Sequence, residues 1–306
     1  MDIKQLHYLV ALAEERHFTR AAERCNVTQP TLSGRIRQLE QELGVPIVER
    51  GQRYHDLTPE GSRVLQWAQA ILRDCAAMEE ELTALKGGLS GRVALGVVPS
   101  ALPMVVALTR TMRQHYPDVR FAVYSRTSDE ILREIQDFQL DAGITYLDNE
   151  PVRHMTTFDL YGERYRLFVP RDHPWAHRKA VTWREAAAEP LCLLTPNMQN
   201  RRIIDHAFER VGQTPITPIE TDSIVNLWAH IKYAGLSSIL PEYFGELLAS
   251  SDTSIATIAL DDLEPSHRVG LVTLERDPLS PLVAALFETC RNSRFFPLDA
   301  SAQTPD

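Results

Sequence analysis

The sequence predicts three parts in succession: a small helical unit at the N-terminus, one long helix, and a larger α/β domain. Residues 1–57 contain short segments with helical apolar spacing, and residues 58–86 contain one long helical pattern that ends at "GGLSG". From Arg92 onward, short apolar runs such as "RVALGVV", "VRFAVYS", "LDAGITYL" and "YRLFVP" alternate with helical segments. This alternation is typical of an α/β domain with a largely parallel sheet.

The composition is that of a soluble globular protein with room for two domains. The chain has 306 residues, of which 44% are hydrophobic and 24% are charged. No apolar run reaches the roughly 18 residues of a membrane span, and the start "MDIKQLHYLV" lacks the features of a secretory signal. The four cysteines, Cys25, Cys75, Cys192 and Cys290, have no metal-like spacing. We therefore expect a cytoplasmic protein with reduced thiols.

The charge is acidic overall but locally basic. A net charge of −9 argues against a general polyanion binder. Residues 16–53, however, carry seven Arg and only four Glu. This local excess permits contact with DNA without proving it.

Three short helices are expected in the N-terminal unit. Leu6 and Leu9 share one face of the first helix. Thr19 is the expected N-cap of the second helix, and Thr28 is the expected N-cap of the third. Gly44 is expected to end the third helix.

The third helix has an outward polar face at its start. Leu32 and Ile36 lie on the opposite side, toward a core. Gln29 suits adenine, Ser33 can bond to several bases, and Pro30 can contact a thymine methyl group. Two short helices joined by a tight turn, with such residues at the start of the second, form the helix-turn-helix arrangement. An ordinary helical hairpin in a core fits this spacing equally well.

The long helix carries a heptad seam. Thr58, Pro59 and Glu60 supply an N-cap, a first-turn proline and an acid that favours the helix dipole. Apolar or small residues then follow at alternating spacings of four and three: Val64, Ala68, Ile71, Cys75, Met78, Leu82 and Leu85. This spacing favours coiled-coil-like dimerisation, and the alternative is a surface helix on the core of its own domain.

The chain resembles one regulator family over nearly its whole length. The stretch "FTRAAERCNVTQPTLSGRIRQLEQELGVPIVERGQRYHDLTPEG" closely resembles the DNA-binding module of LysR-type transcriptional regulators, and "GVVPS", "LDAGI" and "VPRDHPWA" continue the resemblance in the expected order. The resemblance implies a winged helix-turn-helix over residues 1–58, a linker and dimerisation helix over 59–88, and an effector-binding domain over 92–300. That domain would have the type-2 periplasmic-binding-protein fold. Its lobe I would comprise about 92–162 and 267–296, and its lobe II about 163–266.

The resemblance also implies which residues meet DNA. Four residues of the third helix would enter the major groove, with further contacts from nearby arginines and from the wing. The expected DNA-binding residues are Gln29, Pro30, Thr31, Ser33, Arg35, Arg37, Arg50 and Arg53. Two positions depart from the family pattern: Gly34 stands where many relatives have a long polar side chain, and Val48 stands where an aromatic residue is usual.

Polar residues follow four expected strands of the α/β domain, in "VVPSALP", "YSRTSDEIL", "TPNMQNRR" and "ETDSIVNL". Backbone N–H groups at helix starts bind anions, and members of the resembled family commonly bind small organic acids between the lobes. The expected effector-binding residues are Ser100, Ala101, Thr127, Ser128, Asn200, Arg201 and Ser223. Each could instead be a simple helix cap.

These features predict a sequence-specific bacterial transcriptional regulator rather than an enzyme. We find no Walker A, GxGxxG or HExxH motif, and we expect no cofactor, metal site or catalytic residue. The expected partners are promoter DNA with an interrupted inverted repeat, a small-molecule effector, RNA polymerase, and further copies of the chain in a dimer of dimers. The alternatives are a cytosolic solute-binding protein and a redox sensor that uses Cys192 and Cys290.

Overall fold

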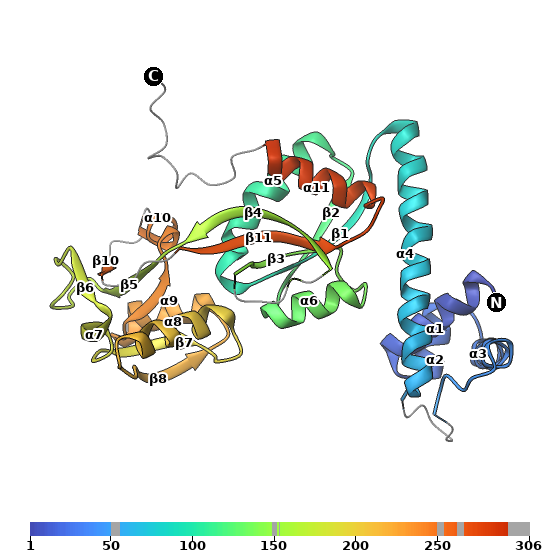
Figure 1. The fold of residues 1–306 in the computed structure, drawn as a ribbon, viewed down its shortest axis with the longest axis horizontal. Helices are drawn as coiled ribbons and strands as arrows, with labels where there is room; N and C mark the ends of the chain where they lie inside the picture. Colours follow the sequence, from blue (N-terminus) through green and yellow to red (C-terminus); the bar gives the residue numbers. More distant parts are fainter. Residues whose placement is uncertain (50–55, 149–151, 153, 250–253, 262–265, 293–306) are drawn as a thin grey trace. The chain divides into compact units, whose positions relative to one another are not determined.

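The computed structural model describes residues 1–49, 56–148, 152, 154–249, 254–261 and 266–292. The chain divides near Ser90 into two compact units, which are coloured along the sequence in Figure 1. The first unit holds the helices α1 to α4, and the second holds the sheets. Among the described residues, no helix is both long enough and apolar enough to cross a membrane.

The first unit is a three-helix domain on which a fourth, longer helix begins. Its helices are α1 (Ile3–Glu15), α2 (Phe18–Arg24), α3 (Gln29–Leu43) and α4 (Pro59–Gly87). Leu9 and Leu12 of α1 pack with Leu32 and Leu39 of α3, and all four side chains are fully buried. Ala21 of α2 is also buried, because its small side chain lets neighbouring helices approach closely.

Two expected caps differ from those observed. α2 begins earlier than expected, at Phe18, because His17 is its N-cap: the Nδ1 atom of His17 accepts the N–H of Thr19 at 3.2 Å. Thr28 does occupy the N-cap position of α3, but its side chain makes no capping hydrogen bond. Gly44 ends α3 in the left-handed conformation (φ 71°), as expected.

The segment after α3 is tied closely to the helices. Val48 pairs with Leu57 in an antiparallel bridge and is buried in the helical core, so an aliphatic residue fills this place. The carboxylate of Glu40 accepts the N–H groups of Ile47 and Val48 at 2.8 and 3.1 Å. Gly61 of α4 approaches so closely that an added Cβ would lie 2.0 Å from the carbonyl oxygen of Ile47.

The two halves of the heptad seam of α4 lie in different surroundings. The hydroxyl of Thr58 accepts the N–H of Gly61 at 2.8 Å, which confirms the expected N-cap. In the first turns, Val64, Ala68 and Ile71 pack against the core of their own domain, and Ala68 is fully buried. The first half of the seam therefore contacts its own domain, and dimerisation through the seam stays a prediction. Further along α4, the large apolar side chains of the seam are exposed.

Lobe I of the second unit is built on a five-stranded sheet with the order β2-β1-β3-β11-β4. Its elements are β1 (Gly91–Val97), η1 (Pro99–Met104), α5 (Val105–His115), β2 (Val119–Ser125), α6 (Ser128–Gln136), β3 (Ala142–Tyr146), β4 (Met155–Glu163), β11 (His267–Leu274) and α11 (Pro281–Asn292). In Figure 1, α5 and α11 cover one face of this sheet and α6 covers the other. Gly143 of β3 leaves room for α6, since an added Cβ would lie 2.2 Å from the side chain of Ile131.

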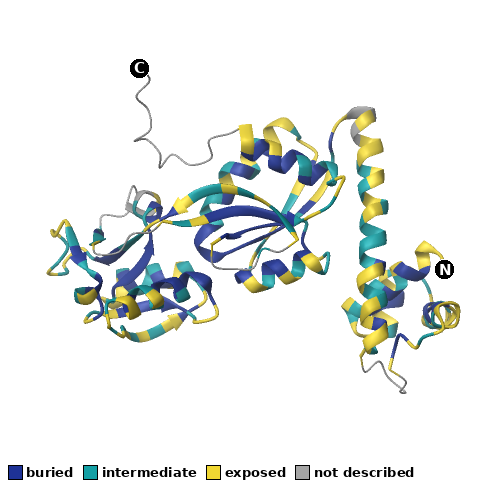
Figure 2. Ribbon diagram, viewed as in Figure 1, coloured by how far each residue is buried: buried dark blue, intermediate teal, exposed yellow. Residues whose placement is uncertain are grey.

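Lobe II is built on a four-stranded sheet, β6-β10-β5-β9, and a two-stranded sheet, β7-β8. Its elements are β5 (Tyr165–Pro170), β6 (Ala180–Thr182), α7 (Trp183–Ala186), β7 (Pro190–Leu194), α8 (Gln199–Arg210), β8 (Ile216–Thr221), α9 (Ile224–Ala234), β9 (Ser238–Pro241), α10 (Tyr243–Ala249) and β10 (Ile255–Asp261). Its strand β7 is buried almost throughout, as are β3 and most of β11 in lobe I (Figure 2). Such unbroken burial explains why these strands appear in the sequence as continuous apolar runs.

The sheets are mixed, so the expectation of a largely parallel sheet was wrong. β1 is parallel to β2 and β3, but β11 is antiparallel to both β3 and β4. In lobe II, β5 is antiparallel to β9 and β10. The apolar run of β11 predicts a strand correctly, but it does not tell its direction. β11 returns to lobe I only after the chain has passed through lobe II.

Candidate functional site

The start of α3 presents polar side chains to solvent. Gln29, Pro30 and Thr31 are exposed, whereas the neighbouring Leu32 is fully buried. Ser33 is half-buried. The buried leucine fixes the orientation of the helix, so the outward face of its first turn is available to a partner.

The backbone at this helix start is also open. The hydroxyls of Thr28 and Thr31 bond to each other at 2.8 Å, and neither caps the helix. Leu32 donates its N–H to the carbonyl of Thr28 at 3.1 Å, which closes the first turn. Because the earlier N–H groups of a helix have no partner within the helix, an uncapped start favours an anion such as a phosphate.

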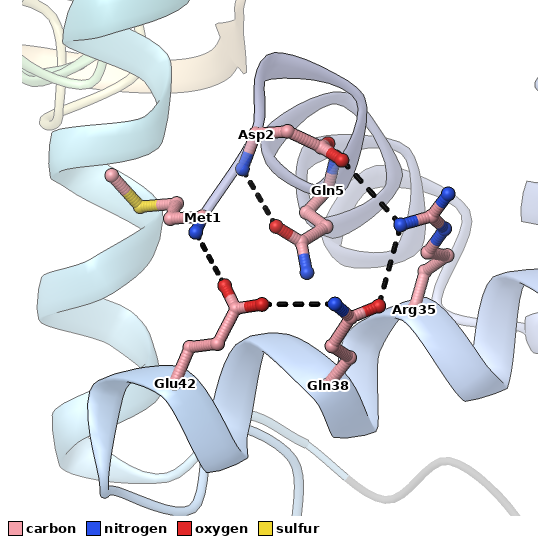
Figure 3. Close-up of polar contacts among 6 residues, drawn as sticks. All are labelled: Met1, Asp2, Gln5, Arg35, Gln38 and Glu42. Carbon is pink, nitrogen blue, oxygen red and sulfur yellow. Dashed lines mark hydrogen bonds and ion pairs between the residues drawn. The ribbon is translucent and has the colours of Figure 1, made fainter.

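The next turns of α3 are bound to the start of α1 by a chain of polar contacts (Figure 3). Arg35 donates to Asp2 at 3.5 Å and to Gln38 at 3.3 Å. Gln38 donates to Glu42 at 2.9 Å. Asp2 is itself the N-cap of α1, with its carboxylate accepting the N–H of Gln5. Arg35 therefore contacts its own domain, and Arg37 of the same helix is exposed.

Of three further positions considered in the sequence, the structure describes only Gly34. Gly34 is exposed, and an added Cβ would meet nothing within 4 Å, so the space for a longer side chain is present. Arg50 and Arg53 lie outside the described residues.

In the second unit, four polar residues follow or end strands that run in the same direction. Ser100 follows β1, Ser128 follows β2, Tyr146 ends β3, and Glu163 ends β4. β1, β2 and β3 are mutually parallel, and β4 shares their direction because β11 is antiparallel to both β3 and β4. These four residues therefore lie at the same end of the lobe I sheet, where the strands β1 to β4 terminate.

Three of the predicted effector residues have local structural roles. The hydroxyl of Thr127 accepts the N–H of Glu130 at 3.2 Å at the start of α6. The hydroxyl of Ser223 caps α9 by accepting the N–H of Asn226 at 3.4 Å. Ala101 uses its backbone N–H in a hydrogen bond to the carbonyl of Val98 at 2.9 Å. The cap interpretation therefore describes Thr127 and Ser223.

Arg201 is engaged inside lobe II. Its guanidinium, which is 9% exposed, donates to Asp205, to Glu220 and to the carbonyl of Leu194, at 2.8, 2.8 and 2.7 Å. Burial opposes the charge, but the bonds to Asp205 and Glu220 outweigh it and raise the pKa of Arg201. Its charge is thus already balanced by two carboxylates.

Ser128 and Asn200 differ from the other predicted residues, because they are buried without partners. The Oγ of Ser128 and both amide atoms of Asn200 have no hydrogen-bond partner among the described residues, although the side chains are 0% and 3% exposed. Each lies in the first turn of a helix, α6 or α8. An ion pair of 3.9 Å between Asp129 and Arg202 brings these two first turns near each other. Buried polar atoms without partners are uncommon and mark places where a ligand or water belongs.

Ser100 belongs to a buried network that the sequence does not reveal. Its hydroxyl lies 2.9 Å from that of Tyr146, and Tyr146 donates to Glu163 at 2.5 Å. Tyr165, across the crossing from β4 to β5, donates to the same carboxylate oxygen at 2.7 Å. Glu163 is 1% exposed, and among the described residues its carboxylate accepts hydrogen bonds from tyrosine hydroxyls.

This setting changes the acidity of the network. Burial raises the pKa of Glu163 to about 7, although the hydrogen bonds from Tyr146 and Tyr165 act in the opposite direction. Burial also raises the pKa values of Tyr146 and Tyr165 well above 10, and the nearby carboxylate adds to this effect. The tyrosines are therefore neutral near pH 7, while Glu163 is divided between its two protonation states.

Known proteins match the chain over both units. The family described as "Bacterial regulatory helix-turn-helix protein, lysR family" matches residues 3–62, and the "LysR substrate binding domain" matches residues 86–294. The chain is 35% identical over 293 residues to the DNA-binding transcriptional dual regulator OxyR of Escherichia coli K12, covering 95% of each protein. It is 30% identical to the uncharacterized HTH-type transcriptional regulator YybE of Bacillus subtilis, covering 96% of this chain and 99% of the relative.

Solved structures agree with this relationship. A full-length OxyR variant from Pseudomonas aeruginosa superposes with a TM-score of 0.78 and 26% identity, covering 100% of this chain and 98% of that one. The fold is also that of CbnR in complex with its target DNA, with a TM-score of 0.67, 20% identity, and coverage of 95% and 99%. The chain therefore belongs to the LysR family of DNA-binding transcriptional regulators, with an N-terminal helix-turn-helix and a two-lobed α/β effector-binding domain, and it is not an enzyme.

Proposed function

We propose that this regulator binds promoter DNA as a dimer, with the start of each α3 in the major groove of one half of an interrupted inverted repeat. The supporting observation is the first turn of α3, where Gln29, Pro30 and Thr31 are exposed at a helix start without a side-chain cap. A glutamine can make paired hydrogen bonds to adenine, and free N–H groups at a helix start can bind phosphate.

The second copy is proposed to contact the exposed apolar stripe of α4. At 100° per residue, four of its exposed side chains fall within about 60° of one another on one face: Trp67, Met78, Leu82 and Leu85. Apolar side chains grouped on one exposed face indicate an interaction surface. Association into a dimer of dimers and contact with RNA polymerase, both in the cytoplasm, are proposed on the family relationship alone.

The DNA proposal is tested by removing the side chains at the start of α3. Gln29→Ala combined with Ser33→Ala should weaken operator binding about a hundredfold, because each base contact contributes roughly 1–3 kcal/mol. A gel-shift titration with intergenic DNA beside the gene measures this change. Gln41→Ala, an exposed substitution near the other end of α3, is the control and should bind as the unmodified protein does. Unchanged affinity of the double variant would exclude α3 as the reading helix.

For the effector, we propose a small organic acid bound at the starts of α6 and α8. The supporting observation is that Ser128 and Asn200 are buried there with polar atoms that lack partners. A carboxylate could accept from the Ser128 hydroxyl and the Asn200 amide, and both helix starts favour a negative charge. Ser100 completes the proposed site from the neighbouring strand end.

Ser100→Ala tests this site through the effector response. The variant should need about tenfold more acid for the same change in operator binding, since one hydrogen bond to a charged group contributes roughly 1.5–3 kcal/mol. Its operator affinity without effector should stay unchanged. A thermal-shift screen of organic acids supplies the ligand, because specific binding raises apparent stability. An identical dose–response curve would remove Ser100 from the site.

A second candidate function, peroxide sensing, is suggested by relatives with the name "Hydrogen peroxide-inducible genes activator". Thiol sensing requires an accessible thiolate. Cys192 and Cys290 are 0% and 4% exposed, and burial raises their pKa values to about 11 and 12. We therefore favour the acid effector over this pair as a redox switch. Peroxide-treated protein should bind operator DNA unchanged, whereas a loss reversed by dithiothreitol would favour the redox function.

A further inference from the structure

The buried network around Glu163 connects a titrating carboxyl group to the proposed effector site. Ser100 bonds to Tyr146 at 2.9 Å, and Tyr146 bonds to Glu163 at 2.5 Å. Glu163 therefore lies two hydrogen bonds from Ser100. All three side chains are buried, with exposed fractions of 1%, 0% and 1%.

Each hydroxyl in this chain has a single proton to donate. When Glu163 is ionised, it can only accept, so Tyr146 must donate to it. The oxygen of Tyr146 then accepts the proton of Ser100, and the oxygen of Ser100 can serve a ligand only as an acceptor. A carboxylate ligand has no proton to offer and finds no donor there.

Protonation of Glu163 allows the hydrogen bonds between Glu163, Tyr146 and Ser100 to reverse their direction of donation. One proton from solvent binds the carboxylate, and the resulting O–H can donate to the oxygen of Tyr146. Tyr146 can then donate to Ser100, which frees the O–H of Ser100 for a ligand. No other group changes its charge in this step, so the whole change consumes one proton.

We propose that Glu163 is a positioning residue that sets the hydrogen-bonding direction of Ser100 through Tyr146, so that the site takes up a small organic acid together with one proton. This inference rests on the proposed effector site and adds to it the charge state that the site requires. Charge repulsion also favours uptake of a proton, since a bound anion near the buried carboxylate of Glu163 favours the neutral form of that carboxyl group.

The other titratable groups around Glu163 do not compete for this role. Those that face it come from β3, β4, β5, α10 and β11: Tyr146, Tyr161, Tyr165, Tyr243 and His267. The pKa values of the four tyrosines are raised well above 10, chiefly by burial. Burial lowers the pKa of His267 below its ordinary value, and a variant at this histidine therefore serves as a control.

The first test needs no ligand. An infrared pH titration of the full-length protein follows the carboxyl band of Glu163, which is assigned by its loss in Glu163→Gln. Ser100→Ala should move this titration to higher pH, because ionised Glu163 loses the support that Ser100 gives through Tyr146. In a Tyr146→Phe background the same substitution should have no effect, since the connection is already broken. A titration that Ser100→Ala leaves unmoved, in protein that retains Tyr146, would overturn the inference.

The second test uses acetate, benzoate and succinate as probes in thermal-shift titrations at pH 6 and pH 8. With a pKa of about 7, the protonated fraction falls about tenfold across this range, so the affinity for a bound acid should fall about tenfold as well. Glu163→Gln and Tyr146→Phe should lose this dependence, whereas Tyr165→Phe and His267→Gln should keep it. Equal affinity at both pH values in the unmodified protein would overturn the inference.

Failure of the proposed function gives a different result. If none of the three acids binds at either pH, the acid effector is contradicted, and the infrared titration alone decides whether Ser100 and Glu163 are connected.

Discussion

The starts of α3 and α6 use similar polar residues in opposite surroundings. At the start of α3, Gln29 and Thr31 are exposed to solvent. At the start of α6, Thr127 and Ser128 are 7% and 0% exposed, and the hydroxyl of Ser128 has no partner among the described residues. A large partner such as DNA needs side chains that project from the surface. A small ligand can instead replace the water that buried groups have lost.

This difference has an energetic consequence. Removing an exposed side chain should change binding but not stability, because solvent had already satisfied it. Removing a buried side chain without a partner should change binding and improve stability, since an unsatisfied buried group costs about 1–3 kcal/mol. Three substitutions test this difference between exposed and buried polar groups.

The largest effect on stability is expected from Glu163→Gln. The pKa of Glu163 rises from 4.5 in a solvated chain to about 7 in the folded protein. Between these values the folded chain holds a proton that the unfolded chain has lost, so the free energy of unfolding falls as the pH rises. At ~1.36 kcal/mol per pH unit this loss is roughly 3 kcal/mol, and Glu163→Gln should not show it.

Urea denaturation at pH 5 and pH 8 measures this difference. Glu288→Gln, at an exposed position of α11, is the matched control and should follow the unmodified protein. If Glu163→Gln loses as much stability between the two pH values as the control does, Glu163 is not the buried acid that the structure indicates.

A smaller effect of opposite sign is expected from Ser128→Ala. Because its hydroxyl is fully buried without a partner, its removal should raise the free energy of unfolding by about 1 kcal/mol. The same variant should respond more weakly to the acid effector. Urea denaturation and the operator dose–response curve measure the two results, and Thr127→Ala, which removes a cap, should destabilise instead. A destabilised Ser128→Ala would mean that its hydroxyl has a partner after all.

The smallest effect is expected from Gly34→Gln on the exposed face of α3. Since an added Cβ meets nothing within 4 Å, the change should stabilise the helix by up to about 1 kcal/mol, because glycine is a poor helix former. If the long side chain reaches a base, affinity for some operator sequences should rise by a few fold. Circular dichroism melting and a gel-shift comparison across operator variants measure both effects. Loss of stability would show that the space around Gly34 is not open.

The features that could be predicted from the sequence depend on neighbouring residues. Gly44 ends α3 and Thr58 caps α4 as expected, because each acts within a few residues of its own position. The strict seam of alternating spacings omits Trp67, an exposed residue that lies 11 residues before Met78 and therefore on the same face of α4. The direction of β11 was also missed, because it depends on the path through lobe II.

The Glu163 network could not be predicted because its members are far apart in the sequence. Ser100 and Tyr146 are 46 residues apart in the sequence, and Tyr146 and Glu163 are 17 apart. Glu163 occurs in "YGERYRLF", where nothing distinguishes it from a solvated surface carboxylate. Only the pairing of β3 and β4 with β11 brings the three residues to one edge of the sheet.

The close tie between α4 and residues 46–48 has a mechanical consequence. Thr58, at the start of α4, bonds to the carbonyl of Pro46, and Glu40 of α3 holds the N–H groups of Ile47 and Val48. Hydrogen bonds thus join α3, residues 46–48 and the start of α4. With 29 residues, α4 is roughly 43 Å long at ~1.5 Å per residue. If α4 stays straight, a tilt of about 5° at its far end displaces α3 by roughly 4 Å, more than the rise of one base pair. In the proposed dimer, such a lever would convert a small change in how two subunits meet into a change of register on DNA.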